Sequence, residues 1–252
     1  MNYYNEFDPY AAQWLRSLIA AGHIPAGDVD ERSIVDVRAD DLRGYTQCHF
    51  FAGIAGWSLA LALAGWPADR PVWTGSCPCQ PFSAAGKQQG LADDRHLWPV
   101  WFDLIRQCRP SIVYGEQVEE AVRHGWLDGV FADLEGEDYA CGAAVLGAHS
   151  VGAPHIRQRL WWVADANNKG LEGRRERGVE CRTERSSWAG CVALRGRDGV
   201  QRRVEPSIQP LAHGVQNRVG RLRAFGNSIC PETGAEFIRA SAPDLHPERF
   251  AQ

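Results

Sequence analysis

The chain has 252 residues, of which 44% are hydrophobic and 23% are charged, and its formal net charge is −4. This composition is typical of a globular protein with one sizeable domain and a small appendage, and it excludes a wholly disordered chain. The sequence has no run of about 18 apolar residues, and its start, MNYYNEFDPY, lacks the basic and apolar regions of a signal peptide. We therefore expect a soluble cytoplasmic protein.

The eight cysteines include no CxxC pair. This spacing predicts neither a zinc site nor the disulfide framework of a secreted protein. We expect no bound metal, and we expect most of these thiols to be buried or idle.

The first elements combine a helix with a glycine-bearing turn. Residues 9–21 place Trp14, Leu15, Leu18 and Ile19 on one helical face, and Gly22 follows as a stop. The apolar run from Thr46 then enters the turn AGIAG and a segment that ends at Gly65. This order predicts a strand, a tight turn and a helix, which together form a Rossmann-type unit.

The alternation of helices and strands continues through the middle of the chain. A helix is predicted over 97–108, a strand over 111–118, a helix near 127–134 and an apolar strand over 159–166. Such alternation predicts an α/β fold with a doubly wound, mostly parallel sheet.

The character of the sequence changes after Asp165, where arginine and glycine become frequent and periodicity is lost. Between Asp165 and Phe225 there are 13 Lys plus Arg against 7 Asp plus Glu, a local net charge of +6, which leaves −10 for the rest. We predict a domain over 1–164, a small insertion over 165–216 and a returning segment over 217–252. A basic segment on an acidic body fits either a phosphate-contacting surface or a solvated polar loop.

The most informative segment is Trp73–Ser83, WTGSCPCQPFS. It places the thiol of Cys79 in a proline-rich turn after a predicted strand, at the edge of the sheet where open α/β proteins bind ligands. A lone cysteine in such a turn is more often a buried thiol, but the whole string closely resembles the catalytic loop of the cytosine-C5 methyltransferases. The resemblance implies that Cys79 attacks carbon 6 of a flipped-out cytosine in double-stranded DNA before carbon 5 is methylated. Cys77 is then a neighbour and not the nucleophile.

Two further motifs are similar to those of this family. Glu116, in the string Glu-Gln-Val, resembles its Glu-Asn-Val motif, which implies an acid that assists at N3 of the base. Arg157 and Arg159 alternate on a predicted strand and resemble its Gln-x-Arg-x-Arg motif. The resemblance implies that Arg159 grips the base oxygen and Arg157 a nearby phosphate. From these two residues alone, an exposed edge strand is an equally good interpretation.

The methyl donor implied by the resemblance is S-adenosylmethionine. Phe51, Gly53, Ile54 and Gly56 lie in a turn like the family's methionine-binding loop. The spacing to the next acid, Asp69, does not fit a ribose contact. The N-terminal segment instead resembles the ribose and adenine motifs, with Glu6 on the ribose, Phe7 stacked on adenine, and Asp28 with Val29 at the adenine edge. We infer a local permutation, as in small phage or prophage forms, that puts these strands beside the glycine strand. An N-terminal helical extension with coincidental acids is the alternative.

The remaining assignments also follow the resemblance. Near the C-terminus, GRLRAFGNSICP is similar to the family's closing motif and implies that Asn227 and Ser228 return to the methionine end of the donor. Further donor contacts are implied for Pro78 and Leu97. Contacts to the base or the DNA are implied for Gln80, Ser83, Arg174, Arg175, Arg182, Arg195, Arg202 and Arg203.

Four positions depart from the family pattern, namely His49, Ala55, Gln117 and His155. They keep a second function open, a DNA-binding protein with this fold that has lost turnover. Methylation of tRNA by the same cysteine chemistry is a third. For the preferred enzyme we expect a monomer, with a role in restriction, viral protection or regulation.

Overall fold

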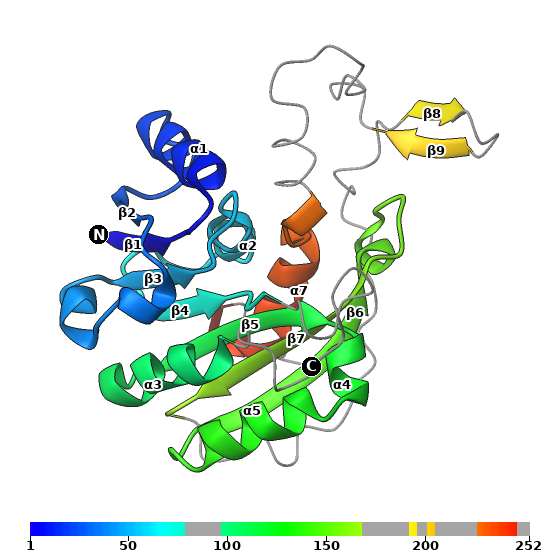
Figure 1. The fold of residues 1–252 in the computed structure, drawn as a ribbon. Coiled ribbons are helices and arrows are strands. Elements are labelled where there is room, and N and C mark those ends of the chain that lie inside the picture. The colour runs from blue at the N-terminus through cyan, green and yellow to red at the C-terminus, as the bar shows by residue number, and fades with distance from the viewer. Residues whose placement is uncertain (79–96, 168–191, 196–200, 205–225, 246–252) are drawn as a thin grey trace.

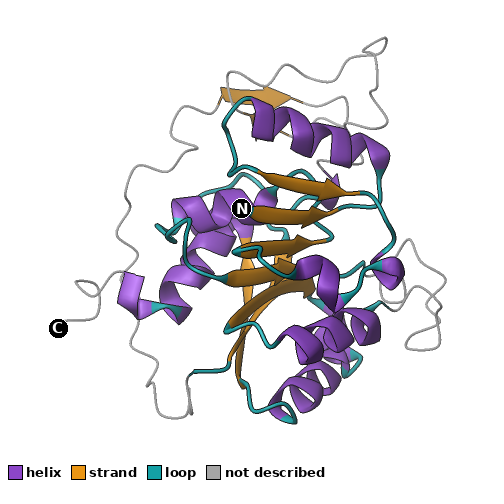
Figure 2. Ribbon diagram, turned by 90° about the vertical axis from the view of Figure 1, so that its left-hand side faces the viewer, coloured by secondary structure: helices purple, strands orange, loops and turns teal. Residues whose placement is uncertain are grey.

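The computed structural model describes residues 1–78, 97–167, 192–195, 201–204 and 226–245. Within these ranges a seven-stranded sheet has the order β2-β1-β3-β4-β5-β7-β6, with helices on both of its faces (Figures 1 and 2). The strands are β1 (Asn2–Asn5), β2 (Gly27–Asp30), β3 (Gln47–Phe50), β4 (Val72–Gly75), β5 (Ile112–Val118), β6 (Ala140–Gly147) and β7 (Gln158–Asp165). The α-helices are α1 (Pro9–Ala20), α2 (Gly56–Leu63), α3 (Trp98–Cys108), α4 (Glu120–Arg123), α5 (Trp126–Glu135) and α7 (Pro231–Ser241).

Short 3₁₀ helices complete this part of the chain. They are η1 (Ile34–Asp36), η2 (Ala39–Leu42), η4 (Ala148–Val151) and η5 (Pro243–Leu245). In none of the described segments does a helix have the length and apolarity needed to cross a membrane.

The predicted α/β fold is confirmed. The strands from β2 through β5 pair in parallel, whereas β7 runs antiparallel between β5 and β6. The strand β6 was not predicted, because its sequence ACGAAVLG has small residues and a weak apolar pattern. Its presence makes β7 an internal strand, so the alternative interpretation of β7 as an exposed edge is wrong.

The predicted position of the N-terminal strands is confirmed. β1 pairs with β2 on one side and with β3, the glycine strand, on the other. The two strands at this edge of the sheet, β1 and β2, therefore precede the glycine strand in the chain. The carboxyl ends of β1 and β3 lie together at Asn5 and Phe50, so the residues that follow each strand become neighbours.

The first helix shows how local sequence sets an element. Asp8 is the N-cap, and its side chain accepts hydrogen bonds from the backbone N–H groups of Tyr10 and Ala11. Pro9 follows at the first helical position, where no N–H donor is needed. The buried face of α1 packs against the sheet, and Gly22 adopts a positive φ of 71° after the helix.

Tryptophan rings dominate the core on both faces of the sheet. Trp161 and Trp162 follow each other on β7 and point to opposite faces, as the two-residue period of a strand requires. Trp162 packs with Trp98 and Trp101 under α3, while Trp161 packs with Trp57 of α2. Burial of these large rings supplies much of the apolar area that stabilises the sheet.

The insertion is described only over a hairpin of two strands, β8 (Val192–Arg195) and β9 (Gln201–Val204). The two strands pair antiparallel and form a sheet of their own. The sequence analysis predicted no element here, since a pair of four-residue strands is too short for a periodic signal. The proposed limits of the insertion stay a prediction.

Candidate active site

Glu116 lies on β5 at the point where its parallel neighbour β4 ends. Gly75 is the last residue of β4 and pairs with Gly115, so Glu116 is the first residue of β5 beyond this pairing. A side chain at Gly115 would overlap the Trp162 ring, because an added Cβ would lie 2.0 Å from its Cε2. Glycine at this position therefore lets the ring pack directly beneath the carboxyl-bearing segment.

The carboxyl of Glu116 is buried and charge-paired. Its residue is 8% exposed, and its Oε1 lies 3.0 Å from Nε of Arg159 on the neighbouring strand β7. Burial raises the pKa of Glu116, and this effect outweighs the guanidinium of Arg159 and the hydrogen bond from Ser76, which both lower it. The carboxyl is thus able to hold or share a proton under conditions in which an exposed glutamate is ionised.

Arg157 is placed differently from the prediction. It lies just before β7 with a φ of 34°, so it does not alternate with Arg159 on the strand. Its Nη2 donates hydrogen bonds to the carbonyl oxygens of Gly226, at 3.1 Å, and Ser228. Arg157 therefore connects the start of β7 to the closing motif, while Arg159 alone pairs directly with Glu116.

Two residues near this site, Gln117 and His155, depart from the family pattern. Gln117 has a structural role, and His155 lies at the surface. Gln117 accepts a hydrogen bond from the N–H of Val118, and its Nε2 donates to the carbonyl oxygen of Cys77 at 3.4 Å. Gln117 thereby attaches the start of the cysteine loop to β5. His155 is exposed in the turn before β7.

Cys77 is buried, and burial raises the pKa of its thiol. A thiol in this state stays protonated and is a poor nucleophile, which agrees with its predicted role as a neighbour. Pro78, the next residue, is exposed at the end of the described segment. Cys79, Gln80 and Ser83 lie outside the described residues.

The glycine loop and the N-terminal segment meet at the carboxyl ends of β1 and β3. The carboxylate of Glu6 accepts hydrogen bonds from the N–H of Asp8, at 2.8 Å, and from the N–H of Gly53, at 2.6 Å. Phe7 follows with 72% of its surface exposed. The structure thus brings together the predicted ribose and methionine elements, although more than 40 residues of sequence separate them.

The glycine loop has an unusual backbone. Phe51, Gly53 and Ala55 have φ values of 52°, 56° and 68°. In this loop the N–H of Gly53 is directed to a carboxylate, that of Glu6. Ile54 is partly buried between Gly53 and Ala55.

The loop also touches the closing motif. A Cβ added at Gly56 would lie 2.6 Å from Cγ1 of Ile229 and 3.4 Å from Oγ of Ser228. The absence of a side chain at Gly56 therefore lets the closing motif approach the loop directly. Asn227 is exposed and Ser228 is half-buried beside this contact.

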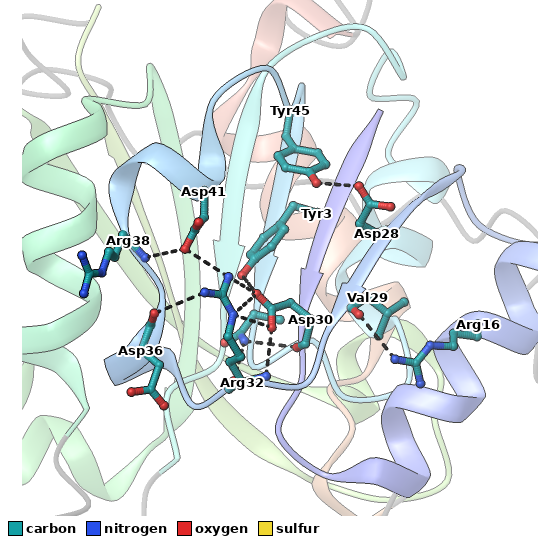
Figure 3. Close-up of polar contacts among 11 residues, drawn as sticks. Tyr3, Arg16, Asp28, Val29, Asp30, Arg32, Asp36, Arg38, Asp41 and Tyr45 are labelled. Carbon is teal, nitrogen blue, oxygen red and sulfur yellow. Dashed lines mark hydrogen bonds and ion pairs between the residues drawn. The ribbon is translucent and has the colours of Figure 1, made fainter.

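Asp28 and Val29 lie on the outermost strand, β2 (Figure 3). Asp28 pairs with Tyr3, two positions before the end of β2, and its carboxylate accepts a hydrogen bond of 2.5 Å from Tyr45. Val29 packs on the opposite face, and its carbonyl oxygen accepts a hydrogen bond from Arg16. Asp30, at the end of β2 beside Glu6, instead pairs with Arg32.

His49 is a core residue. It is 1% exposed, its Nδ1 lies 2.8 Å from Oγ1 of Thr74, and its ring stacks on Tyr4. Burial lowers the pKa of His49 to about 3. The imidazole is therefore neutral and internally bonded, and it lies in the sheet interior, below the strand ends.

The other predicted residues fall into two groups. Leu97 is the partly buried N-cap residue of α3 and packs against the core cluster that contains Trp98 and Trp101. Arg195 is on β8, and Arg202 and Arg203 are on β9. The remaining three, Arg174, Arg175 and Arg182, lie outside the described residues.

Sequence reasoning did not assign a role to Ser76 or Trp57, although both lie at the site. Ser76 follows β4 beside Glu116, and Nε1 of Trp57 donates to its Oγ at 3.1 Å. Only the register between β4 and β5 reveals this proximity. Among the described residues, no group of three or more histidines, cysteines and acids could hold a metal ion.

Part of this chain is similar to known proteins. The model of the C-5 cytosine-specific DNA methylase family matches residues 67–187, which include the cysteine loop, Glu116 and Arg159. Type II methyltransferase M.AplI of Arthrospira platensis is 35% identical over 95 residues, which are 37% of this chain and 28% of that protein. Type II methyltransferase M.HhaI of Haemophilus parahaemolyticus is 30% identical over 110 residues, 41% of this chain and 33% of that protein.

The matched part thus spans a third or less of the length of these curated relatives. Among solved structures, Spodoptera frugiperda DNMT2 is 15% identical with a TM-score of 0.45, over 71% of this chain and 45% of that one. This structural likeness is too weak to support an inference. The sequence matches show that residues 67–187 are similar to the C-5 cytosine-specific DNA methylase family and that this region is shared with type II methyltransferases.

Proposed function

We propose that this protein transfers a methyl group from S-adenosylmethionine to carbon 5 of cytosine in double-stranded DNA. The observation that carries the proposal is the buried pair of Glu116 and Arg159, placed beside the strand end that leads into the loop of Cys79. A carboxyl with a raised pKa beside a guanidinium offers both a proton and a fixed cation to a polar base. This pair lies within the region matched by the family model.

The described residues fit the methyl donor. The carboxylate of Glu6 is held at the strand edge by two backbone N–H groups and suits ribose hydroxyls, and the exposed ring of Phe7 suits adenine. We assign the glycine loop, with its positive φ angles at Phe51 and Gly53, to the methionine end of the donor. When bound, the donor supplies an electrophilic methyl group on a sulfonium.

The chain's own residues carry the remaining steps. The thiolate of Cys79 adds to carbon 6 of the base, and Glu116 donates or shares a proton at N3 as charge develops there. Arg159 holds the base oxygen and keeps the carboxyl of Glu116 in place. Carbon 5 then takes the methyl group, after which loss of the carbon 5 proton expels the thiolate and restores the aromatic ring.

The base must leave the duplex before this chemistry begins. Extrusion costs a few kcal/mol, so contacts to phosphates and to the flipped base have to offset it. We assign phosphate or base-edge contacts to the insertion, with Arg174, Arg175, Arg182, Arg195, Arg202 and Arg203 as the candidates. A short insertion of this kind fits a short or relaxed recognition sequence.

The test is covalent trapping on duplex DNA that carries 5-fluorocytosine, with unlabelled tRNA and duplex DNA assayed in parallel for methyl transfer. The active protein should form a stable adduct because fluorine cannot leave as a proton does. Cys79→Ser should form none. A protein that binds this DNA without forming an adduct would overturn the proposal, as would transfer to tRNA alone. Bisulfite sequencing of DNA from expressing cells then gives the recognition sequence.

A further inference from the structure

β4 ends beside the middle of β5, and this point brings two polar residues together. The register pairs Trp73 with Val113, Thr74 with Tyr114 and Gly75 with Gly115. Ser76 is the first residue after β4, and Glu116 is the next residue of β5. Because the strands are parallel, these two side chains leave the sheet at the same edge.

A chain of hydrogen bonds runs from the core to the carboxyl. Trp57, at the start of α2, is 3% exposed, and its Nε1–H donates to Oγ of Ser76 at 3.1 Å. An indole N–H can only donate, so it occupies an acceptor site of the hydroxyl. The hydroxyl of Ser76 retains its own hydrogen to donate, and the carboxyl of Glu116 is the adjacent acceptor, because the two residues continue the register of Gly75 and Gly115.

We propose that Ser76, oriented by the indole of Trp57, is a positioning residue that fixes the carboxyl of Glu116 for its work on the base. The proposal rests on the proposed function, because it concerns the acid of that reaction. Arg159 holds one oxygen of the carboxyl from β7, and the relay from Trp57 through Ser76 approaches from β4 and α2. Two supports from different elements restrict rotation of the carboxyl better than one.

The electrostatic consequence has a definite sign. The charged groups that face Glu116 are Arg159 and Arg157, and both favour its ionised form, as does the hydrogen bond from Ser76. Burial opposes them and dominates. Removing the hydroxyl of Ser76 takes away one donor and should raise the pKa of Glu116 further.

The experiment measures the single-turnover rate of methyl transfer against pH for the wild type, Ser76→Ala, Ser76→Thr and Trp57→Phe. If Glu116 supplies a proton, the rate falls as pH rises through its pKa. Ser76→Ala should lower the rate and should shift the falling limb of the pH–rate profile upward by about one pH unit. A shift of this size corresponds to the loss of one hydrogen bond to a charged group. Ser76→Thr keeps the hydroxyl and should keep the limb in place.

Trp57→Phe preserves the ring but removes the N–H, and it should move the limb in the same direction by a smaller amount. The matched control is Trp161→Phe, in the same aromatic cluster, because Nε1 of Trp161 has no partner among the described residues. Since Trp57 acts through Ser76, the double variant Trp57→Phe/Ser76→Ala should shift no further than Ser76→Ala alone. Additive shifts, an unmoved limb, or an equal shift in Trp161→Phe would overturn the relay.

A second measurement separates this inference from the proposed function. Infrared titration of protein with ¹³C-labelled glutamate follows the protonation of Glu116 without any substrate. The spectrum of Glu116→Gln identifies the band that belongs to this carboxyl. Ser76→Ala should move that titration upward even if the wild type methylates no DNA. An unmoved titration in an active enzyme would overturn the relay and leave the methyltransferase proposal standing.

Discussion

Glu6 and Glu116 both lie where parallel strands end in the sheet, but their surroundings differ. At the ends of β1 and β3, the carboxylate of Glu6 is held by backbone N–H groups beside an exposed aromatic ring. Where β4 ends beside β5, the carboxyl of Glu116 is buried against a guanidinium and a serine hydroxyl. An accessible carboxylate suits binding of hydroxyl groups, whereas a buried one gains a raised pKa and suits proton transfer. On this basis we assign binding of the donor to the half of the sheet edge around Glu6, the binding half, and the chemical step to the half around Glu116, and the predictions below test that assignment.

The largest effect is expected from Glu116→Gln, which removes the acid but keeps the shape. The methyl-transfer rate should fall by roughly 10²- to 10⁴-fold, the usual contribution of a positioned acid or base. Affinity for the donor should stay unchanged, since the donor elements lie in the other half. Single-turnover kinetics with a labelled donor and calorimetric donor titration measure the two quantities. A large loss of donor affinity would contradict the division.

Glu6→Ala should produce the reverse pattern. Loss of hydrogen bonds to a charged group should weaken donor binding by roughly 10- to 100-fold, with a smaller effect on the rate at saturating donor. The matched control is Asp69→Ala, which removes an exposed acid between the glycine helix and β4. Should Asp69→Ala abolish donor binding while Glu6→Ala leaves it intact, the permuted assignment fails.

His49 gives the binding half its own pH dependence. Its pKa falls to about 3 in the folded state from an ordinary value of 6.5, because it is buried between Thr74 and Tyr4. Between about pH 6.5 and pH 3, the unfolded chain therefore binds a proton at His49 that the folded chain does not bind. The free energy of unfolding decreases as the pH is lowered through this range. The slope from this group approaches about 1.4 kcal/mol per pH unit.

Urea unfolding of the wild type and His49→Gln at several pH values between 7 and 4 measures this dependence. His49→Gln cannot take up the proton, so its stability should vary less with pH than that of the wild type. Parallel pH profiles would show that His49 is not a neutral core residue.

The smallest effects are expected in the glycine loop. Gly53→Ala should destabilise the fold by about 1 to 2 kcal/mol, because φ is 56° and an added Cβ meets no atom within 4 Å, so the cost is that of the backbone alone. Ala55 already has a φ of 68°, which is strained for a residue with a side chain. Ala55→Gly relieves this backbone strain but raises the conformational entropy of the unfolded chain, so the two effects oppose each other. Its net change should stay within about 1 kcal/mol in thermal unfolding. Equal losses in both variants would show that side-chain contacts, and not φ, control the loop.

Most of the longer helices and several of the strands could be predicted from the sequence because their signals are local. Asp8 and Pro9 start α1 through their own side-chain chemistry, and the apolar spacing from Leu97 to Cys108 matches the single face that α3 buries. β6 was missed because small residues such as Ala143 and Ala144 carry little strand preference until β7 packs beside them.

The sequence predicts which residues belong to the site, whereas the tertiary structure decides how those residues are arranged. The strings around Cys79, Glu116 and Arg159 indicate the chemistry, because reactive groups must be encoded as particular side chains. The pairing of Glu116 with Arg159, the turn of Arg157 toward the closing motif, and the contact of Ser76 with Trp57 depend on strand register and burial. Register and burial arise from packing between segments distant in the chain, and no local pattern specifies them.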